Sequence, residues 1–351
     1  MKPDHRFRRC HSFVCLALLL GWVVERPGFG EEITATVSPA IELTFPTEAG
    51  AFYQIERLQS GKWQPFGEAR TGTGQSWTER LPGTASEWRV RRLRQQWALV
   101  WADEFNGDRL DPTKWSREEN GYGGGNNERQ FYSADPAYAP VKDGLLHLSV
   151  HRKPHTTVDG KTQPYTSARI RSLERGDWTY GRFEVRAKVP GGEGIWPAVW
   201  MLPSTPRYGG WAASGEIDIL ESRGSAVHET LGTLHFGGAW PKNRHVGAAY
   251  RFPGPDAAAA FHTYAIEWKR GEIRWLVDDT LWQTRTSDEW HSDAAPDQPD
   301  APFDQPFHLI LNVAVDGGFF NGTGQQADRL PDSAFPQVFQ VDYVRVSQWA
   351  E

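Results

Sequence analysis

The chain has 351 residues and a formal net charge of −6, with 17 Trp, 10 Tyr and 18 Phe beside 35 Gly and 24 Pro. A net negative charge argues against nucleic acid as a partner. The many aromatic and turn-forming residues favour β architecture over helix bundles, and this number of Trp side chains is typical of a surface that stacks on a flat, weakly charged ligand.

Residues 1–30 have the pattern of an export signal. Basic residues between Lys2 and Arg9 precede the apolar run SFVCLALLLGWVV, which has about the length of a signal-peptide core and is too short to span a bilayer comfortably. A membrane anchor is the alternative interpretation. Cys10 and Cys15 are the only cysteines, so the mature chain would contain no disulfide. We therefore expect a secreted monomer, extracellular or periplasmic, with no membrane contact in its mature form.

Residues 33–95 are predicted to form a small β module of unknown role. Its short runs alternate apolar and polar residues between Gly- and Pro-containing breaks: IELTFPTE, AFYQIERLQ, KWQPFGEA and SEWRVRRL. Such closely spaced strands predict a small sandwich. The module contains no acid pair and no cluster with metal-ligand spacing, so carbohydrate binding and simple spacing both stay open.

Residues 98–351 form the second predicted domain. Strand-like runs recur along it, and no long stretch shows an apolar stripe at the helical period; the runs include LLHLSVHR, GRFEVRAKV, IWPAVWMLP, PFHLILNVAV and VFQVDYVRV. Many antiparallel strands in one domain of this size predict two packed sheets. The fold class is therefore predicted to be all-β.

The segment GEIDILE in this domain places three acids, Glu216, Asp218 and Glu221, on a β-branched strand. Glu216 and Asp218 share one face because side chains alternate along a strand, whereas Glu221 has the wrong parity. A β-bulge beside Ile219 would restore the parity. All three carboxylates would then lie on one face, with Ile217 and Ile219 pointing into the core.

Three interpretations of these acids stay open on the residues alone. A retaining glycosidase uses two carboxyl groups about 5–5.5 Å apart, and crowded like charges raise the pKa of the one that acts as acid. Under this interpretation Asp218, between Glu216 and Glu221, would repel both charges and hydrogen-bond to the nucleophile. A calcium cluster also uses several carboxylates, although calcium loops are usually flexible and rich in Gly and Asn. The third interpretation is a solvated strand face without a function.

Three Trp residues lie just before the acids. Trp196 and Trp211 stand beside Gly or Pro breaks and are predicted to line a cleft, whereas Trp200 stands in an alternating run and is predicted to lie in the core. Because sugars stack on aromatic rings, a cleft with Trp and two carboxylates suits a polysaccharide.

GEIDILE resembles the E-x-D-x-x-E signature of glycoside hydrolase family 16 in its bulged, laminarinase-like form. Other blocks resemble the family in the same order across most of the second domain, among them WADEFNGDRLDPTKW, GGGNNERQFY, YTSARIRS, TLHFGGAWP and LILNVAVDGG. One short motif would be weak evidence, but an ordered series is specific. The resemblance implies a β-jelly-roll sandwich of the concanavalin A type with a long concave cleft.

The resemblance also implies roles for single residues. Glu216 would be the nucleophile, Glu221 the general acid/base, and Asp218 would tune Glu216. His235 would lie near the cleavage point, unless it is a structural strand histidine. Sugars on the non-reducing side of the cut would be held by Asn127, Arg169, Trp196 and Trp211.

No cofactor is expected for catalysis, but family members often bind one calcium ion on the convex face. Glu104, Gly144 and Asp342 stand where its ligands would come from. The alternative is that the two acids cap turns or pair with nearby arginines.

Two departures from the family pattern affect the expected cleft. Ala168 stands where laminarinases commonly have Gly, and Phe319 and Phe320 replace a more usual polar-Trp pair. Neither departure touches the acids. The sequence therefore predicts a secreted, retaining endo-glycosidase that hydrolyses β-1,3-glucan by double displacement. The alternatives are an agar- or carrageenan-type galactan hydrolase of the same family and a non-catalytic glucan-binding protein.

Overall fold

The computed structural model describes residues 40–48, 52–67, 70–72, 74–83, 87–93 and 96–350. Two compact units divide the chain, one up to Gln96 together with the last two residues, and the other Trp97–Trp349. This division falls beside the expected boundary between residues 95 and 98. The predicted export signal lies outside the described residues. Within the described ranges, no helix is long and apolar enough to cross a membrane.

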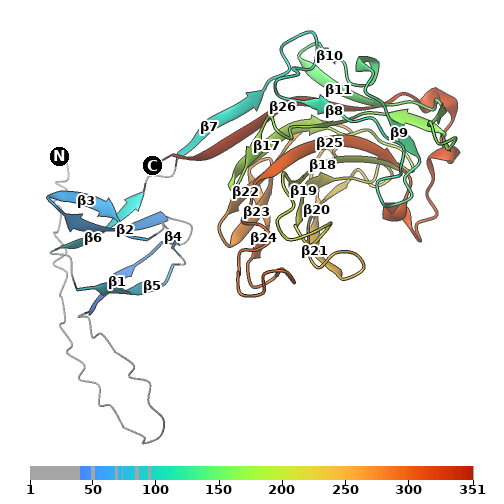
Figure 1. Cartoon of the computed structure of the whole chain (residues 1–351). Coiled ribbons are helices and arrows are strands. Elements are labelled where there is room, and N and C mark those ends of the chain that lie inside the picture. Colours follow the sequence, from blue (N-terminus) through green and yellow to red (C-terminus); the bar gives the residue numbers. More distant parts are fainter. Residues whose placement is uncertain are drawn as a thin grey trace, which may run out of the picture. The chain divides into compact units, whose positions relative to one another are not determined.

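The first unit contains two small antiparallel sheets (Figure 1). One pairs β1 (Ala40–Pro46) with β5 (Ser76–Pro82), and the other joins β2 (Phe52–Gln59) to β3 (Lys62–Pro65), β4 (Arg70–Thr71) and β6 (Trp88–Leu93). Exposed and half-buried side chains alternate along β1, as a strand with one covered face requires. The ring of Phe45 in β1 lies 5.8 Å from that of Tyr53 in β2, so the two sheets share apolar packing.

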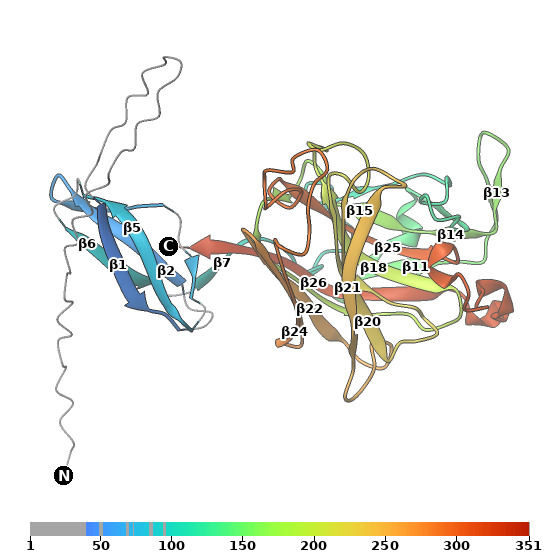
Figure 2. The same ribbon diagram turned by 90° about the horizontal axis from the view of Figure 1, so that it is seen from below.

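The second unit is a sandwich of two eight-stranded sheets. The sheet that carries the site described below, here called the cleft sheet, has the order β21 (Asn243–Arg251), β20 (Glu229–Gly237), β19 (Glu216–Glu221), β18 (Ile195–Pro203), β25 (Phe307–Val315), β15 (Arg169–Arg171) and β8 (Ser116–Arg117), with β16 (Asp177–Trp178) also paired to β25. The covering sheet has the order β10 (Val141–Lys142), β11 (Leu145–Val150), β26 (Gln337–Ala350), β17 (Gly181–Lys188), β22 (His262–Lys269), β23 (Glu272–Val277) and β24 (Thr280–Thr286), with β7 (Gln96–Asp103) also paired to β26. Figure 2 shows the two sheets of this unit from below.

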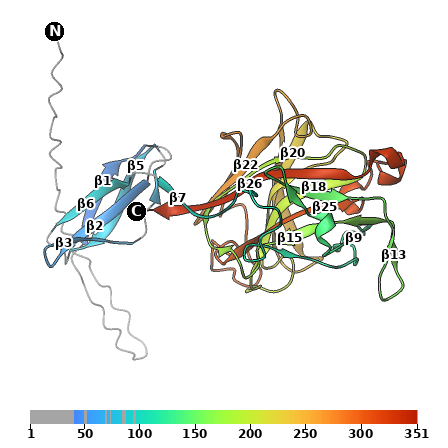
Figure 3. The same ribbon diagram turned by 90° about the horizontal axis from the view of Figure 1, so that it is seen from above.

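Smaller elements complete the second unit. A parallel pair joins β9 (Gln130–Tyr132) to β14 (Tyr165–Ser167), and the hairpin of β12 (His155–Thr156) and β13 (Thr162–Gln163) projects from the sandwich in Figure 3. Four single 3₁₀ turns are described: η1 (Pro136–Tyr138), η2 (Gly318–Phe320), η3 (Ala327–Arg329) and η4 (Asp332–Ala334). The predicted all-β sandwich is thus confirmed.

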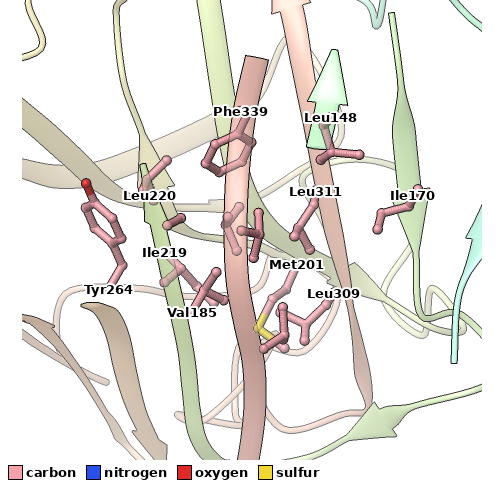
Figure 4. Close-up of a cluster of buried hydrophobic side chains, with 14 of the residues drawn as sticks. Leu148, Ile170, Val185, Met201, Ile219, Leu220, Tyr264, Leu309, Leu311 and Phe339 are labelled. Carbon is pink, nitrogen blue, oxygen red and sulfur yellow. The ribbon is translucent and has the colours of Figure 1, made fainter. Parts of the chain in front are cut away.

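The core lies between the two sheets (Figure 4). Strand β17 alternates buried and half-buried residues along its whole length, which directs Val185 and its neighbours of equal parity inward. From the cleft sheet, Met201, Leu309 and Ile219 meet this layer with 0%, 0% and 3% of their surface exposed. The opposite face of the cleft sheet is therefore free to carry polar groups.

Candidate active site

Strand β19 contains the predicted bulge. Against β18, Leu220 pairs with Val199 and Asp218 pairs with Trp200, which leaves Ile219 without a partner residue. The ladder with β20 shifts over the same residues, between Asp218 and Glu221. The extra residue restores the parity of Glu221, so the predicted break near Ile219–Leu220 is confirmed.

The bulge separates apolar from acidic side chains on this strand. Ile217 is fully buried and Ile219 is 3% exposed, and both belong to the core between the sheets, as predicted. The three acids Glu216, Asp218 and Glu221 line a cleft of about 580 Å³ on the other face. Its volume is typical of a ligand site.

Neighbouring strands supply the floor of this cleft. Alternate residues of β18 point into it, namely Trp196, Ala198, Trp200 and Leu202, and β25 contributes Asn312 and Ala314. The residues between them in β18, such as Val199 and Met201, are fully buried in the core. Strand alternation therefore sorts these two strands into a core face and a cleft face.

Each glutamate accepts a hydrogen bond from one indole. Trp211 Nε1 donates to Glu216 Oε2 at 2.8 Å, and Trp196 Nε1 donates to Glu221 Oε1 at 3.0 Å. Each bond occupies one carboxyl oxygen and leaves the second oxygen of that group for other partners. An indole N–H is only a donor, so it favours an oxygen that carries no proton.

His235 lies between the acids. The pairing of β19 with β20 places it opposite Glu216, and its Nε2 lies 3.6 Å from Glu216 Oε1 and 3.3 Å from Asp218 Oδ2. The sequence had predicted a hydrogen bond from Asp218 to Glu216. In the structure Asp218 Oδ2 makes no such bond and faces the imidazole instead, because the register of β20 brings His235 to that position.

Burial and like charge raise the pKa values of both glutamates. Burial first, and then the charge of Asp218, raise the pKa of Glu216 to about 7, while His235 and the Trp211 bond oppose the rise. Burial, Asp218 and Glu216 hold the pKa of Glu221 well above its usual range. Both carboxyl groups therefore resist ionisation, and Glu216, which has His235 Nε2 3.6 Å from its Oε1, is the one with a cation beside it to favour the charged form.

The imidazole of His235 is positively charged near neutral pH. Burial acts to lower its pKa, but the contact with Asp218 and the charges of the two glutamates raise that pKa to about 9. Donor atoms of Glu216, Asp218 and His235 lie within 4.8 Å of one another, a spacing that a metal ion can bridge. Calcium takes oxygen ligands, and a protonated imidazole offers no lone pair, so the calcium interpretation of these acids fits poorly.

Three of the four predicted sugar-binding residues line the cleft: Arg169, Trp196 and Trp211. Asn127 is exposed, has a positive φ of 58° and is not among the lining residues, whereas its neighbour Asn126 is. The prediction that Asn127 holds a sugar stays a prediction.

The prediction that Trp200 lies in the core is wrong. Trp200 is half-buried and lines the cleft, where its Nε1 donates to Asn312 Oδ1 at 2.7 Å and the guanidinium of Arg169 lies 4.8 Å from its ring centre. A signal was present in the sequence, because Trp196 and Trp200 are four residues apart and share strand parity.

Two exposed aromatic residues of the cleft were missed. Trp240 is 75% exposed and Tyr122 is 65% exposed, and both line the cleft. The backbone N–H of Trp240 donates to the carbonyl of Trp211 at 3.2 Å, which ties two Trp-bearing loops together. Their Gly-rich surroundings, YGGGNN and FGGAWP, were the available signal.

Two of the three proposed calcium ligands, Glu104 and Asp342, pair with arginines. Arg345 donates to both carboxylate oxygens of Glu104 at 2.7 and 2.8 Å, and Asp342 pairs with Arg186. Gly144 lies in the turn between β10 and β11, and β11 pairs with the strand that contains Asp342. Because guanidinium groups already balance both carboxylates, these side chains do not fit a calcium ion, and the calcium expectation stays untested.

Comparison with known proteins is consistent with this geometry. The family model described as glycosyl hydrolases family 16 matches residues 127–329. A glucan endo-1,3-beta-glucosidase A1 of Niallia circulans is 42% identical over 71% of this chain and 37% of its own length. A beta-glucanase of Rhodothermus marinus is 44% identical over 73% of this chain and 86% of its own length.

A solved structure supports the same relationship. The laminarinase from Rhodothermus marinus superimposes with a TM-score of 0.63 at 41% identity, covering 73% of this chain and 99% of that one. The bulged strand and the cleft on one sheet are therefore consistent with the relationship that the sequence similarity shows. The aligned part of the chain spans little more than a third of the length of the first relative.

Proposed function

The chain belongs to family 16 of the glycosyl hydrolases, and we propose that it cleaves internal β-1,3 linkages of glucan with net retention at the anomeric carbon. As a member of this family it is a hydrolase of O-glycosyl bonds. One observation carries the proposal for this chain: a single bulged strand presents Glu216 and Glu221 to one cleft, and His235 lies beside Glu216. The names of the relatives support β-1,3-glucan as the substrate.

The first half of the proposed reaction forms a covalent intermediate. Ionised Glu216 attacks the anomeric carbon with the oxygen that Trp211 leaves free, Oε1. The bond from that carbon to the glycosidic oxygen breaks, and this oxygen takes the proton from Glu221 Oε2, the oxygen that Trp196 leaves free. The leaving chain departs as an alcohol, and the remaining sugar is esterified to Glu216.

The second half returns the enzyme to its starting state. Glu221, now ionised, takes a proton from water while the water oxygen attacks the anomeric carbon. The ester bond to Glu216 breaks and its electron pair returns to the carboxylate. Two inversions at the same carbon give net retention.

His235 and Asp218 set the charge balance of this cycle. The imidazolium lies 3.6 Å from the proposed attacking oxygen, Glu216 Oε1, and favours its ionised form at a pH where burial alone would protonate it. Asp218, 2% exposed, keeps the pKa of His235 high and the pKa of Glu221 raised. Asp218 thus opposes ionisation of both glutamates, whereas the imidazolium favours it, most directly at Glu216.

The test uses Glu216→Gln and Glu221→Gln. Each variant should lose several orders of magnitude in kcat on laminarin, measured as reducing-sugar release, and should keep the wild-type far-UV spectrum. Glu272→Gln, in β23 of the covering sheet, is the matched control and should keep full activity. Near-wild-type turnover by either cleft variant would contradict the assignment.

The same assay separates the alternatives. Product release from agarose or carrageenan but not from laminarin would identify the galactan hydrolase. Retention of the chain on insoluble β-1,3-glucan without product release would identify a glucan-binding protein. Proton NMR of the first product formed tests retention, because the β-anomer must appear before mutarotation.

We further propose that the chain is secreted and acts as a monomer without cofactor. The pattern of residues 1–30 supports export. N-terminal sequencing of the protein recovered outside the cytoplasm, and light scattering after size-exclusion chromatography, test the two statements.

A further inference from the structure

A stack of planar side chains lies behind the proposed acid. The ring of Phe319 packs face to face on the indole of Trp196, with centroids 4.4 Å apart and an angle of 18° between planes. The guanidinium of Arg223 lies 4.3 Å from the centre of the Phe319 ring. Trp196 in turn donates to Glu221. Four side chains therefore form a series that ends on the carboxyl group.

Contacts of the neighbouring residue and of its own carbonyl hold the backbone of Phe319 in place. It belongs to η2, where the next residue, Phe320, is 5% exposed and anchors the turn in the protein interior. Arg223 Nε also donates to the carbonyl of Phe319 at 3.3 Å, and Ser225 bonds to Gln325 farther along the same loop. The backbone beside the acid and the backbone that carries Phe319 are thus tied together.

Phe319 has no polar atom and does not line the cleft. Any effect on the chemistry must therefore pass through a residue that does line it. Its stacked neighbour Trp196 is that residue. The last side-chain torsion of an aromatic residue has a broad energy profile, so packing has to define the plane of the indole ring.

The plane of the Trp196 ring matters because Glu221 must present its proton in one direction. With the indole N–H on Oε1, the proton of the carboxyl group is placed on Oε2. Without that bond, the proton can occupy either oxygen, and only one of them faces the leaving group. General acid–base catalysis by a positioned side chain contributes about 10²–10⁴-fold in rate, and a proton on the wrong oxygen would lose part of that factor.

Among the described residues, no ring is stacked face to face on the second indole. Trp211 is 43% exposed, and the ring of His235 beside it is tilted by 42° at a centroid distance of 5.5 Å. An ionised nucleophile has no proton to place, since both of its oxygens carry charge. The face-to-face stack is therefore on the indole that bonds to Glu221, the glutamate that must place a proton.

We propose that Phe319, clamped by Arg223, is a positioning residue for the general acid, which it controls through the ring plane of Trp196. This inference rests on the role proposed above for Glu221. Phe319 does not touch the substrate; it fixes which oxygen of Glu221 carries the proton.

The test compares leaving groups. Phe319→Ala removes the ring, and Phe319→Tyr keeps it. Phe261→Ala is the matched control, because Phe261 is another half-buried ring under an arginine, 5.0 Å from Arg186, and lies outside the cleft lining. Each variant is assayed for kcat/KM on a β-1,3-gluco-oligosaccharide, whose sugar alcohol leaves poorly without a proton. The second substrate is a 2,4-dinitrophenyl β-1,3-glucobioside, whose phenolate leaves without protonation.

Phe319→Ala should lose roughly tenfold on the oligosaccharide and less than about twofold on the dinitrophenyl substrate, because only the first needs the acid. Phe319→Tyr should restore the oligosaccharide rate, and Phe261→Ala should change neither. Equal losses of Phe319→Ala on both substrates, or no loss on either, would overturn the inference. If Phe319→Ala unfolds, Arg223→Ala keeps both rings and should show a smaller loss with the same substrate dependence.

Glu221→Gln serves as the reference for the underlying mechanism. A large loss on the oligosaccharide and a small loss on the dinitrophenyl substrate would support its role as the acid. If that pattern is seen for Glu221→Gln but not for the Phe319 variants, only the positioning role fails. If Glu221→Gln itself shows no leaving-group dependence, the proposed function fails.

Discussion

Replacing His235 by Gln should move the whole pH–activity profile to higher pH. The imidazolium lies 3.6 Å from Glu216 Oε1 and 3.3 Å from Asp218 Oδ2, and Gln keeps a hydrogen-bonding group there without the charge. Loss of this cation removes a favourable interaction of ionised Glu216. It does the same, at longer range, for ionised Glu221.

The separation of the charges sets the size of the effect. At 3.6 Å, two unit charges interact by about 1 kcal/mol in a water-like medium and by about 5 kcal/mol at an effective dielectric constant of ~20. Since 1.36 kcal/mol corresponds to one pKa unit, the pKa of Glu216 should rise by roughly 1 to 3. The starting pKa of about 7 would then lie in the alkaline range.

The direction in which the pH–activity profile shifts depends on the protonation state that each glutamate must have for the reaction. Glu216 must lose its proton to attack, so the acid limb of kcat/KM moves up with its pKa. Glu221 must keep its proton, and its pKa rises as well, so the alkaline limb moves in the same direction. The assay is kcat/KM on laminarin between about pH 4 and 10 for wild type and variant, with unfolding monitored at each pH.

His245→Gln is the matched control for this measurement. His245 lies opposite His235 in the next strand and is exposed, with its ring 5.7 Å from that of His235. Its replacement should leave both limbs nearly in place. An unchanged acid limb in His235→Gln, or a shift to lower pH, would refute the electrostatic reasoning.

Three further outcomes follow from the same structure. Glu216→Gln should be more stable than wild type above pH 7, by at most about 3 kcal/mol or several degrees in Tm, and no more stable near pH 4. In the wild type, burial raises the pKa of Glu216 from 4.5 to about 7. Glu216 therefore ionises in the unfolded chain before it does in the folded chain, and the wild-type protein loses stability as the pH rises between these two values. Calorimetry that finds no gain in stability of the variant at pH 8 would contradict this. Trp200→Ala should raise KM for laminarin roughly tenfold and change kcat less than about threefold, because a stacking surface is lost without a reacting group; an unchanged KM would return Trp200 to a packing role. Because Arg345 already balances Glu104, neither calcium nor a chelator should move Tm by more than about 1 °C, and a fall of several degrees with chelator would restore the calcium expectation.

Local periodicity was enough to predict the bulged strand. Glu216 and Asp218 alternate with isoleucines, and the odd position of Glu221 required one inserted residue, which is where the ladder shifts. The same rule applied to β18 would have placed Trp200 in the cleft with Trp196. The error came from judging Trp200 by its apolar neighbours instead of by its parity.

Other features depended on strands that are distant in sequence. His235 was selected by family resemblance, but its position between Glu216 and Asp218 follows from the register of β20 on β19. The expected hydrogen bond from Asp218 to Glu216 failed for this reason.

By itself, the sequence determined the all-β class, the acid-bearing strand with its bulge, and the separation of that strand into a core face and a cleft face. These are properties of residue alternation, which is local. Only the tertiary structure decided which groups surround each carboxyl oxygen: the two indoles, the imidazole and the stack of Trp196, Phe319 and Arg223. Those contacts join segments up to 123 residues apart in the case of Trp196 and Phe319, and they exist because two sheets pack and fix the register of neighbouring strands, which no local pattern encodes.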